Sequence, residues 1–369
     1  MSADTGARPT LAVFVSSHGF GHASRSCAVL EHLCDLEPEL QIELFTRIPQ
    51  WFFASLGQHL HFHELDCDLG LVQTDAFEVD YEATLSGLAD RLPFQPDLIQ
   101  NLAQGVSALG CQAVLCDIAP LGLAVAKAAR LPSILVENFT WDWIYSGLAQ
   151  QAPVLENYAT LLQPHFAGAD IHIQTEPVCL PAENAHRLGP IARTFRMSVS
   201  ETRDALSVAS TDPLVLITMG GTHIGFPFLE QLKDRFPEIR FAVSGASETV
   251  ETDHSLTLLP VRGPLHHPDL VRAADLVIGK AGYSTIAEIY AAGVPFGCFI
   301  RADYPEMGPL VKFIEREIPA KMLAPEKFAN GAWLEELPEL LGMKRVSRSS
   351  ISAAAECASL VRTSFLGRK

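Results

Sequence analysis

The stretch from Leu276 to Pro295 constrains the fold of this chain more than any other part of the sequence. Its first residues are an apolar run that predicts the end of a buried strand. Gly279 and Gly282 then predict a turn in which the backbone can approach a ligand. Apolar residues at helical spacing follow, and Gly293 predicts the end of that helix. A strand, a glycine turn and a helix N-terminus together form a site for anions, most often a diphosphate.

Thr285 and Glu288 have the spacing of a capping box, in which the glutamate caps its own helix. Met219-Gly220-Gly221-Thr222 follows another apolar run and is a second candidate phosphate turn.

Composition indicates an acidic protein of about two domains. The 369 residues include 27 Lys and Arg and 43 Asp and Glu, which gives a net charge of −16 and disfavours binding to nucleic acid or an anionic membrane. The eight cysteines form no CxxC pair, so we expect reduced thiols and no disulfide scaffold. We find no signal-peptide core and no apolar run of membrane-spanning length, and we therefore expect a soluble, cytoplasmic protein.

A second glycine turn follows the first predicted strand, 11–15. The letters GFGHAS nearly match the dinucleotide fingerprint GxGxxG, so a nicotinamide or flavin domain is one alternative. The next strand, however, ends in Thr46-Arg47 and offers no acidic residue for a ribose. The turn also contains His18 and His22, and the helix dipole would help to keep His22 neutral near pH 7. The remaining candidate residues of this turn are Gly19, Gly21 and Arg25.

Three further histidines, His59, His61 and His63, alternate along a predicted strand and would share one face of it. This spacing alone is weak evidence for metal binding, and we expect no metal site.

Polar residues end two other predicted strands. Asp117 follows the run Ala113–Cys116, and Asn138 follows the strand that ends at Val136. Parallel sheets place their sites at the carboxyl ends of strands. Asp117 is a site candidate, with helix capping as the alternative. Asn138 and Trp141 suit a sugar ring, although ordinary packing explains them equally well.

The segment from Lys280 to Glu288, with Ala292-Gly-Val-Pro295, resembles the donor-binding signature of GT-B-fold glycosyltransferases. These include plant UDP-sugar transferases and the N-acetylglucosaminyl transferase of peptidoglycan synthesis. The resemblance implies that Glu288 binds both ribose hydroxyls of a nucleotide. Lys280 stands where the plant enzymes have a phosphate-binding histidine. By the same resemblance Val261 lies against the base, and Asp303 or Glu306 binds the sugar. The implied donor-binding residues are Gly220, Gly221, Thr222, Val261, Lys280, Gly282, Ser284, Glu288, Asp303 and Glu306.

The resemblance also implies a catalytic pair. In the inverting transferases of this family, a histidine that ends the first glycine turn removes the acceptor proton, and Gly21-His22 matches it. An aspartate in the place of Asp117 orients that histidine and stabilises its charged form. A cap role for His22 is the alternative, and His18 is the second candidate base. The implied acceptor-side residues are His18, Gly19, Gly21, Arg25, Asn138 and Trp141.

Most of the chain also resembles the N-terminal glycosyltransferase-like region of plant arabinokinase, through HGFGHASR, the stretch 65–80 and Asn138–Trp143. The sugar-kinase domain of that family is absent from this sequence. We therefore expect a GT-B fold of two doubly wound parallel α/β domains, 1–195 on the acceptor side and 196–345 on the donor side. A C-terminal helical segment, 346–369, is expected to pack back toward the first domain.

The expected function is transfer of a sugar from a nucleotide-diphosphate donor to the hydroxyl of a small-molecule or glycan acceptor, with inversion and without a metal or other cofactor. A nucleotide-sugar epimerase of the same fold and a catalytically silent nucleotide-sugar binder are the alternatives. The sequence does not identify the sugar, the base, the acceptor or the oligomeric state.

Overall fold

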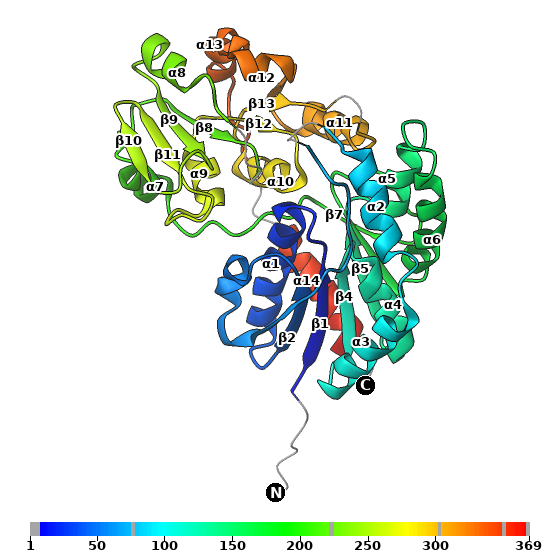
Figure 1. Ribbon diagram of the computed structural model, residues 1–369. Coiled ribbons are helices and arrows are strands. Elements are labelled where there is room, and N and C mark those ends of the chain that lie inside the picture. The colour runs from blue at the N-terminus through cyan, green and yellow to red at the C-terminus, as the bar shows by residue number, and fades with distance from the viewer. Residues whose placement is uncertain (1–7, 75–77, 221–224, 302–303, 349–351, 367–369) are drawn as a thin grey trace, which may run out of the picture. The chain divides into compact units, whose positions relative to one another are not determined.

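The computed structural model describes residues 8–74, 78–220, 225–301, 304–348 and 352–366. The chain divides into two compact units (Figure 1). Unit 1 comprises Met1–Val72, Asp80–Ile191 and Ser352–Lys369, and unit 2 comprises Gln73–Val79 and Ala192–Ile351. The chain passes from unit 1 to unit 2 after Ile191, and the short segment Gln73–Val79 also belongs to unit 2, which the sequence did not indicate. The acceptor-side and donor-side roles expected for 1–195 and 196–345 stay predictions.

Unit 1 is built on a seven-stranded sheet with the order β3-β2-β1-β4-β5-β6-β7, in which all neighbouring strands are parallel. Every residue of the central strands β1, β4 and β5 is buried, as expected for a parallel sheet covered on both faces. The strands are β1 (Thr10–Val15), β2 (Gln41–Thr46), β3 (Leu60–Glu64), β4 (Ala113–Asp117), β5 (Ser133–Glu137), β6 (Ile171–Thr175) and β7 (His186–Leu188).

Helices connect most of these parallel strands, because a crossover between parallel strands needs a long connection. One face of the sheet packs with α1 and the C-terminal helix α14 into a single apolar core, and α1 and α14 lie side by side behind the strands (Figure 1). The helices of unit 1 are α1 (Phe20–Leu36), η1 (Gln50–His59), α2 (Tyr81–Arg91), α3 (Pro96–Ala108), α4 (Pro120–Ala129), α5 (Trp141–Gly147), α6 (Leu155–Ala167) and α14 (Ala353–Leu366).

Unit 2 repeats this plan with the strand order β10-β11-β9-β8-β12-β13-β14. Its neighbouring strands are parallel except for the edge pair β10 and β11, which is antiparallel. The strands are β8 (Leu214–Thr218), β9 (Arg240–Ser244), β10 (Glu251–Asp253), β11 (Leu256–Leu259), β12 (Leu276–Lys280), β13 (Phe296–Phe299) and β14 (Ala320–Leu323).

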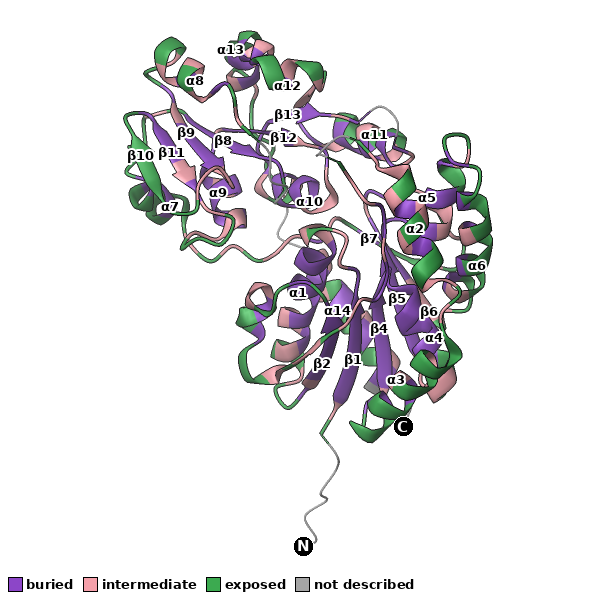
Figure 2. Ribbon diagram, viewed as in Figure 1, coloured by how far each residue is buried: buried purple, intermediate pink, exposed green. Residues whose placement is uncertain are grey.

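The core of unit 2 lies between this sheet and a layer that includes Trp333, which is fully buried. The central strands β8, β12 and β13 are almost wholly buried, whereas the edge strand β10 is exposed, and the outer helices expose one face to solvent (Figure 2). The helices are α7 (Val199–Ala205), α8 (Leu229–Arg235), α9 (His267–Ala273), α10 (Tyr283–Ala292), α11 (Met307–Glu317), α12 (Glu326–Asn330), η2 (Ala332–Glu336) and α13 (Leu337–Leu341). None of the helices in the described ranges is both long and apolar enough to span a bilayer.

The predicted strands 11–15 and 113–117 are confirmed to within one residue. The terminal helix, expected from Val346, begins only at Ala353. Instead, the backbone N–H of Val346 donates a hydrogen bond to the carbonyl of Gly293 at 2.9 Å. Gly293 has φ 65° and ends α10 as predicted.

Gly279 does not lie in the turn, as the sequence led us to expect, but inside β12. A Cβ added to it would lie 2.3 Å from the backbone oxygen of Thr218 in the neighbouring strand β8. Glycine is therefore required there because the two backbones approach closely.

We predict that Gly279→Ala destabilises the protein by about 1 to 3 kcal/mol, because the added methyl group forces β12 away from β8. Gly105→Ala is the matched control, because Gly105 is an exposed residue of α3 with open space around its Cα. That change should stabilise the protein by about 0.5 to 1 kcal/mol. Urea unfolding measures both free energies, and equal effects of the two changes would contradict this account.

Candidate functional site

The first candidate site lies at the carboxyl ends of β1 and β4, which are neighbours in the sheet of unit 1. The turn after β1 leads through Gly19, with φ 81°, into α1, and this places His22 in the first turn of the helix. Asp117 is the last residue of β4. The His22 Nδ1 atom lies 3.0 Å from Asp117 Oδ1. The two residues predicted to form the catalytic pair are thus in hydrogen-bonding contact.

Neither capping alternative fits these residues. The N-cap of α1 is Gly19 and that of α4 is Ala119, and neither helix has a side-chain cap. Asp117 instead accepts from three further groups: Arg25 Nε at 2.9 Å, Arg25 Nη2 at 2.5 Å and Ser26 Oγ at 2.9 Å. Burial alone would raise the pKa of Asp117, but the charges and hydrogen bonds of Arg25 and His22 outweigh burial and lower it. Asp117 is therefore ionised at neutral pH.

Arg25 also contacts polar groups at the carboxyl ends of the neighbouring strands β5 and β6. Its guanidinium donates to Asn138 Oδ1 and lies 3.3 Å from Thr175 Oγ1. Burial would lower the pKa of Arg25, yet the charges of Asp117 and Glu137 raise it. Glu137 is buried and has one oxygen without a hydrogen-bond partner in the described structure. The other oxygen, Glu137 Oε1, lies 2.7 Å from His172 Nε2 and accepts from Gln174 Nε2 at 2.6 Å, so of the two carboxylates only Asp117 contacts Arg25 directly.

The residue after Asp117 has a strained backbone. Ile118 is fully buried and has a φ of 44°, a region that β-branched residues rarely adopt. Its N–H bonds to the carbonyl of Val136 at 3.2 Å, so the sheet holds it in place. Strain of this kind commonly occurs at functional sites. Here the strained residue, Ile118, directly follows Asp117, the carboxylate that contacts His22.

A third buried carboxylate, Asp68, supports the loop that contains His18. Asp68 accepts from Ser16 Oγ at 3.0 Å and from Trp141 Nε1 at 2.8 Å. The His18 ring packs edge-on against Trp141, with ring centroids 5.0 Å apart. The N–H of Leu71 points at His18 Nδ1 from 3.4 Å, which favours the His18 tautomer that has its proton on Nε2.

The predicted acceptor-side residues therefore differ in how accessible they are. Arg25, Asn138 and Trp141 are buried, and their polar groups already bind protein partners. Gly21 lies in the first turn of α1, and His18 is partly exposed. Contact of these six residues with an acceptor stays a prediction.

The second candidate site lies in unit 2 around Glu288. The predicted capping box is wrong, because α10 begins at Tyr283 and Glu288 lies inside the helix, 1% exposed. Its carboxylate instead binds Arg193 Nη2 at 3.1 Å and His267 Nδ1 at 2.6 Å. Burial would raise the pKa of Glu288, but the charges of His267 and Arg193 lower it to about 2. Glu288 is therefore a buried carboxylate anion at neutral pH.

Glycine turns end β8 and β12, which are neighbours in the sheet. Gly220 follows β8 and has φ 70°. The Lys280 Cε atom lies 3.8 Å from the position of a Cβ built on Gly220, so the predicted cation lies over the predicted phosphate turn. Gly282 is the N-cap of α10, and Ser284 lies in its first turn. Gly220 and Lys280 thus lie close together, and Gly282 and Ser284 follow Lys280 within four residues. Phosphate binding by these four residues stays a prediction.

The remaining predicted donor residues are less well defined by the structure. Val261 is exposed and lies beside Gly245. Glu306 is buried and pairs with Arg301 at 2.7 Å, so its carboxylate has a protein counter-ion. Gly221, Thr222 and Asp303 lie outside the described residues.

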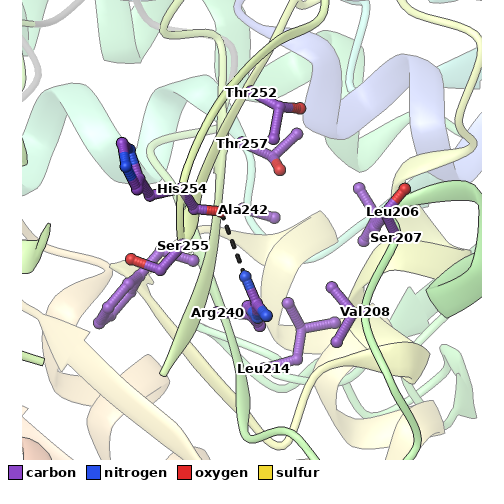
Figure 3. A pocket seen from close by; sticks show the side chains of 11 residues that line it. Leu206, Ser207, Val208, Leu214, Arg240, Ala242, Thr252, His254, Ser255 and Thr257 are labelled. Atoms are coloured by element: carbon purple, nitrogen blue, oxygen red, sulfur yellow. Dashed lines mark hydrogen bonds between the residues drawn. The ribbon is translucent and has the colours of Figure 1, made fainter. Parts of the chain in front are cut away.

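A hollow of about 180 Å³ in unit 2 lies elsewhere (Figure 3). Its lining includes Leu214 and Arg240, the first residues of β8 and β9, so it lies at the amino ends of these strands. Arg240 there binds Asp212 and the carbonyl of His254. Gly220 and Lys280 lie at the opposite, carboxyl ends, so this hollow is separate from the candidate nucleotide site.

The three alternating histidines have protein partners. His61 and His63 both bind the buried carboxylate of Glu43, at 2.8 and 2.6 Å, and His59 contacts the carbonyl of Leu40. Within the described ranges, no group of three or more His, Cys, Asp or Glu is arranged to hold a metal ion.

Sequence reasoning missed Asp68, Arg193 and His267. Asp68 lies in an irregular stretch after β3, and Arg193 lies in the segment between β7 and α7. Only His267 had a recognisable local signal, because proline favours the first turn of a helix and Pro268 follows it directly. The contacts of all three join segments far apart in the chain, which no local pattern reveals.

Comparisons with known proteins agree with this architecture. No protein-family model matches the chain. The chain is 25% identical over 366 residues to an L-arabinokinase from Arabidopsis thaliana, covering 97% of this chain and 34% of that protein. The chain thus spans about a third of the length of that curated relative, which agrees with the expected resemblance.

Two solved structures show the fold. A UDP-glucosyltransferase from Polygonum tinctorium, capable of glucosylating indoxyl, aligns with a TM-score of 0.61 and 16% identity over 98% of this chain and 99% of that chain. A protein from Listeria monocytogenes, assigned provisionally as a UDP-N-acetylglucosamine 2-epimerase, aligns with a TM-score of 0.55 and 13% identity over 98% of both chains. With its two parallel α/β sheets, the protein has the GT-B fold.

We predict that Asp68→Asn alters how stability depends on pH. Burial raises the pKa of Asp68 from 3.8 to about 6, although the hydrogen bonds from Trp141 and Ser16 lower it. Between these values the folded state binds more protons than the unfolded state, so the native protein loses stability as pH rises through this window. The asparagine variant lacks this loss. Its stability relative to the native protein should therefore rise by about 2 to 3 kcal/mol from pH 4 to pH 6.

Urea unfolding at several pH values measures this difference. Asp66→Asn is the control, because Asp66 is partly exposed and pairs with Arg91. Parallel stability profiles for the native protein and Asp68→Asn would contradict the assignment.

Proposed function

We propose that this protein transfers a sugar from a nucleotide-diphosphate donor to an acceptor hydroxyl, with inversion at the anomeric carbon. The observation that carries this proposal is the contact of His22 with Asp117 at the carboxyl ends of parallel strands in a GT-B fold. A histidine oriented by a buried carboxylate is an arrangement suited to general-base catalysis.

In this mechanism, the Nδ1–H of His22 donates to Asp117, which leaves the lone pair on Nε2. Nε2 accepts the proton of the acceptor hydroxyl as its oxygen attacks the anomeric carbon. The new C–O bond forms as the bond to the nucleoside diphosphate breaks, and the diphosphate leaves with the bonding electrons. The Asp117 carboxylate, in direct contact with Nδ1, stabilises the imidazolium that forms.

His18 is the weaker candidate for the base. The contact of the Leu71 N–H with His18 Nδ1 leaves the proton of the neutral ring on Nε2. Such a ring donates through Nε2, whereas a base must accept there. We therefore assign His18 a contact with the acceptor and not the proton transfer.

The donor is assigned to unit 2. Lys280 and the backbone N–H groups near Gly220 and Gly282 would bind the diphosphate and stabilise the charge of the leaving group. Glu288 would accept hydrogen bonds from the ribose hydroxyls. An ammonium group and N–H donors supply the positive potential that the leaving group needs, so the proposed mechanism uses no metal ion.

An epimerase is the second candidate function, because the fold is shared with the protein from Listeria monocytogenes. A nucleotide-sugar epimerase would release an isomerised nucleotide sugar, and a silent binder would release nothing. The polar cluster of unit 1 supports the transferase more directly, because one oriented histidine is what an acceptor hydroxyl requires.

We predict that His22→Ala lowers turnover by about 10²- to 10⁴-fold and leaves nucleotide-sugar affinity nearly unchanged, because the base acts on the acceptor. Asp117→Asn should cause a smaller loss, because the imidazole remains but its orientation and charge are less well supported. His18→Ala is the matched control and should be milder than His22→Ala.

Initial rates with a working donor and acceptor, together with calorimetric titration of the donor, test this prediction. Near-normal turnover of His22→Ala with loss in His18→Ala would move the base to His18. Normal turnover of both variants would refute the mechanism.

We also predict that Glu288→Gln weakens nucleotide-sugar binding by about 1.5 to 3 kcal/mol, because it removes a charged acceptor for the ribose hydroxyls. The change also removes the buried partner of Arg193 and His267, so the protein should lose stability as well. Calorimetric titration of the folded variant measures the affinity. Unchanged affinity with a lowered melting temperature would show that Glu288 is structural only.

A further inference from the structure

We propose that His267 is a positioning residue that holds the Glu288 carboxylate in the orientation that binds the ribose of a nucleoside diphosphate. This inference rests on the proposed function of Glu288 and extends it to a residue that the sequence did not indicate. All the residues involved lie in unit 2.

His267 bridges two parts of the proposed donor site. It is the first residue of α9, where Pro268 follows and fixes the start of the helix. Its Nδ1 atom lies 2.6 Å from Glu288 Oε2 on α10, and its Nε2 atom lies 3.0 Å from Thr218 Oγ1. Thr218 ends β8, two residues before the glycine turn assigned to the diphosphate. The His267 imidazole thus connects Glu288, the residue proposed to bind the ribose hydroxyls, to the strand that precedes the proposed phosphate turn.

The hydrogen-bonding capacity of Glu288 distinguishes its two partners. An ionised carboxylate offers about four acceptor positions. Arg193 contacts Oε1 through Nε at 3.4 Å and Nη2 at 3.1 Å, and His267 contacts Oε2 at 2.6 Å. These three contacts occupy three of the four acceptor positions, so one remains. Two ribose hydroxyls need more than that one position. The longer contacts with Arg193 are therefore the ones that can give way, and the short contact with His267 is the one that stays.

This arrangement assigns different roles to the two partners. His267 fixes the plane of the carboxylate from a position anchored at both ring nitrogens. Arg193 neutralises the buried carboxylate and yields part of its hydrogen bonding when the ribose binds. Without His267, the carboxylate could rotate and bind Arg193 through both oxygens, a favoured geometry for this pair. Glu288 would then remain buried and ionised but would be poorly oriented for ribose.

The neighbouring residue provides a matched control. His266 has the same side chain and lies next to His267, but its Nε2 contacts the carbonyl of Thr194 at 3.2 Å and not Glu288. Burial, followed by the charges of Arg193 and Arg196, lowers the pKa of His266 to about 3, so this ring is neutral. Removing His266 changes the local packing of α9 without removing the contact with Glu288.

The test measures discrimination between ribose and deoxyribose. Calorimetry with UDP, ADP, GDP and CDP, and with their 2′-deoxy forms, is carried out on the native protein, His267→Ala, His267→Asn and His266→Ala. The native protein should prefer the ribonucleotide by at least about tenfold, the value of one hydrogen bond to a charged group. His267→Ala should reduce this preference to about twofold or less. His267→Asn places an amide N–H near the position of Nδ1 and should restore most of it.

If the role of His267 is only structural, His267→Ala will weaken the binding of the ribonucleotide and of its 2′-deoxy form equally and leave the ratio of their affinities unchanged. That result would overturn this inference but not the proposed donor site. An equal loss of preference in His266→Ala would also overturn it, because the effect would then not depend on the contact with Glu288. If His267→Ala does not fold, the ratio for His267→Asn decides, and a fall to the value expected for alanine would contradict the inference. Failure of the native protein to bind any of the diphosphates would instead overturn the proposed donor site.

Discussion

The buried carboxylate of Asp117 is the interaction on which the candidate site of unit 1 depends. It accepts from His22, Arg25 and Ser26 of α1, so the helix is tied to the end of β4 by a charged group. A single buried charge would be costly, and the guanidinium of Arg25 offsets that cost. Arg25 also contacts Asn138 and Thr175, so the same guanidinium links α1 to the carboxyl ends of β5 and β6. The site therefore combines a stable anchor for α1 with a carboxylate placed to orient His22.

Unit 2 also stabilises a buried carboxylate, with different residues. Glu288 is also a buried carboxylate at the carboxyl end of a parallel sheet, and it too pairs with one arginine and one histidine. The contact distances differ, because His267 binds closely and Arg193 more loosely. In both units the polar cluster lies beside a glycine turn, where side chains are absent and a ligand can approach the backbone. The hollow at the opposite end of the unit 2 sheet has no such turn in its lining.

Most of the fold follows from local patterns in the sequence, because apolar runs that end at glycine or polar residues mark parallel strands. The contact of Asp117 with His22 could be expected from a family resemblance together with the rule for strand ends. Local patterns failed where a long-range contact decides the structure. Thr285 and Glu288 have capping-box spacing, yet the helix begins earlier and Glu288 faces Arg193 and His267. Likewise, Gly279 reads as a turn residue, but it is required by the close approach of Thr218 in the next strand.

The central claim is that the oriented histidine activates an acceptor hydroxyl for displacement at a sugar carbon. Proton NMR of the purified protein with a panel of nucleotide sugars and pooled hydroxyl acceptors tests this claim most directly. The account predicts release of nucleoside diphosphate together with a glycoside, or free sugar when water is the acceptor, whose first-formed anomer is inverted relative to the donor. An isomerised nucleotide sugar without release of nucleoside diphosphate, or a first-formed product of retained configuration, would contradict it.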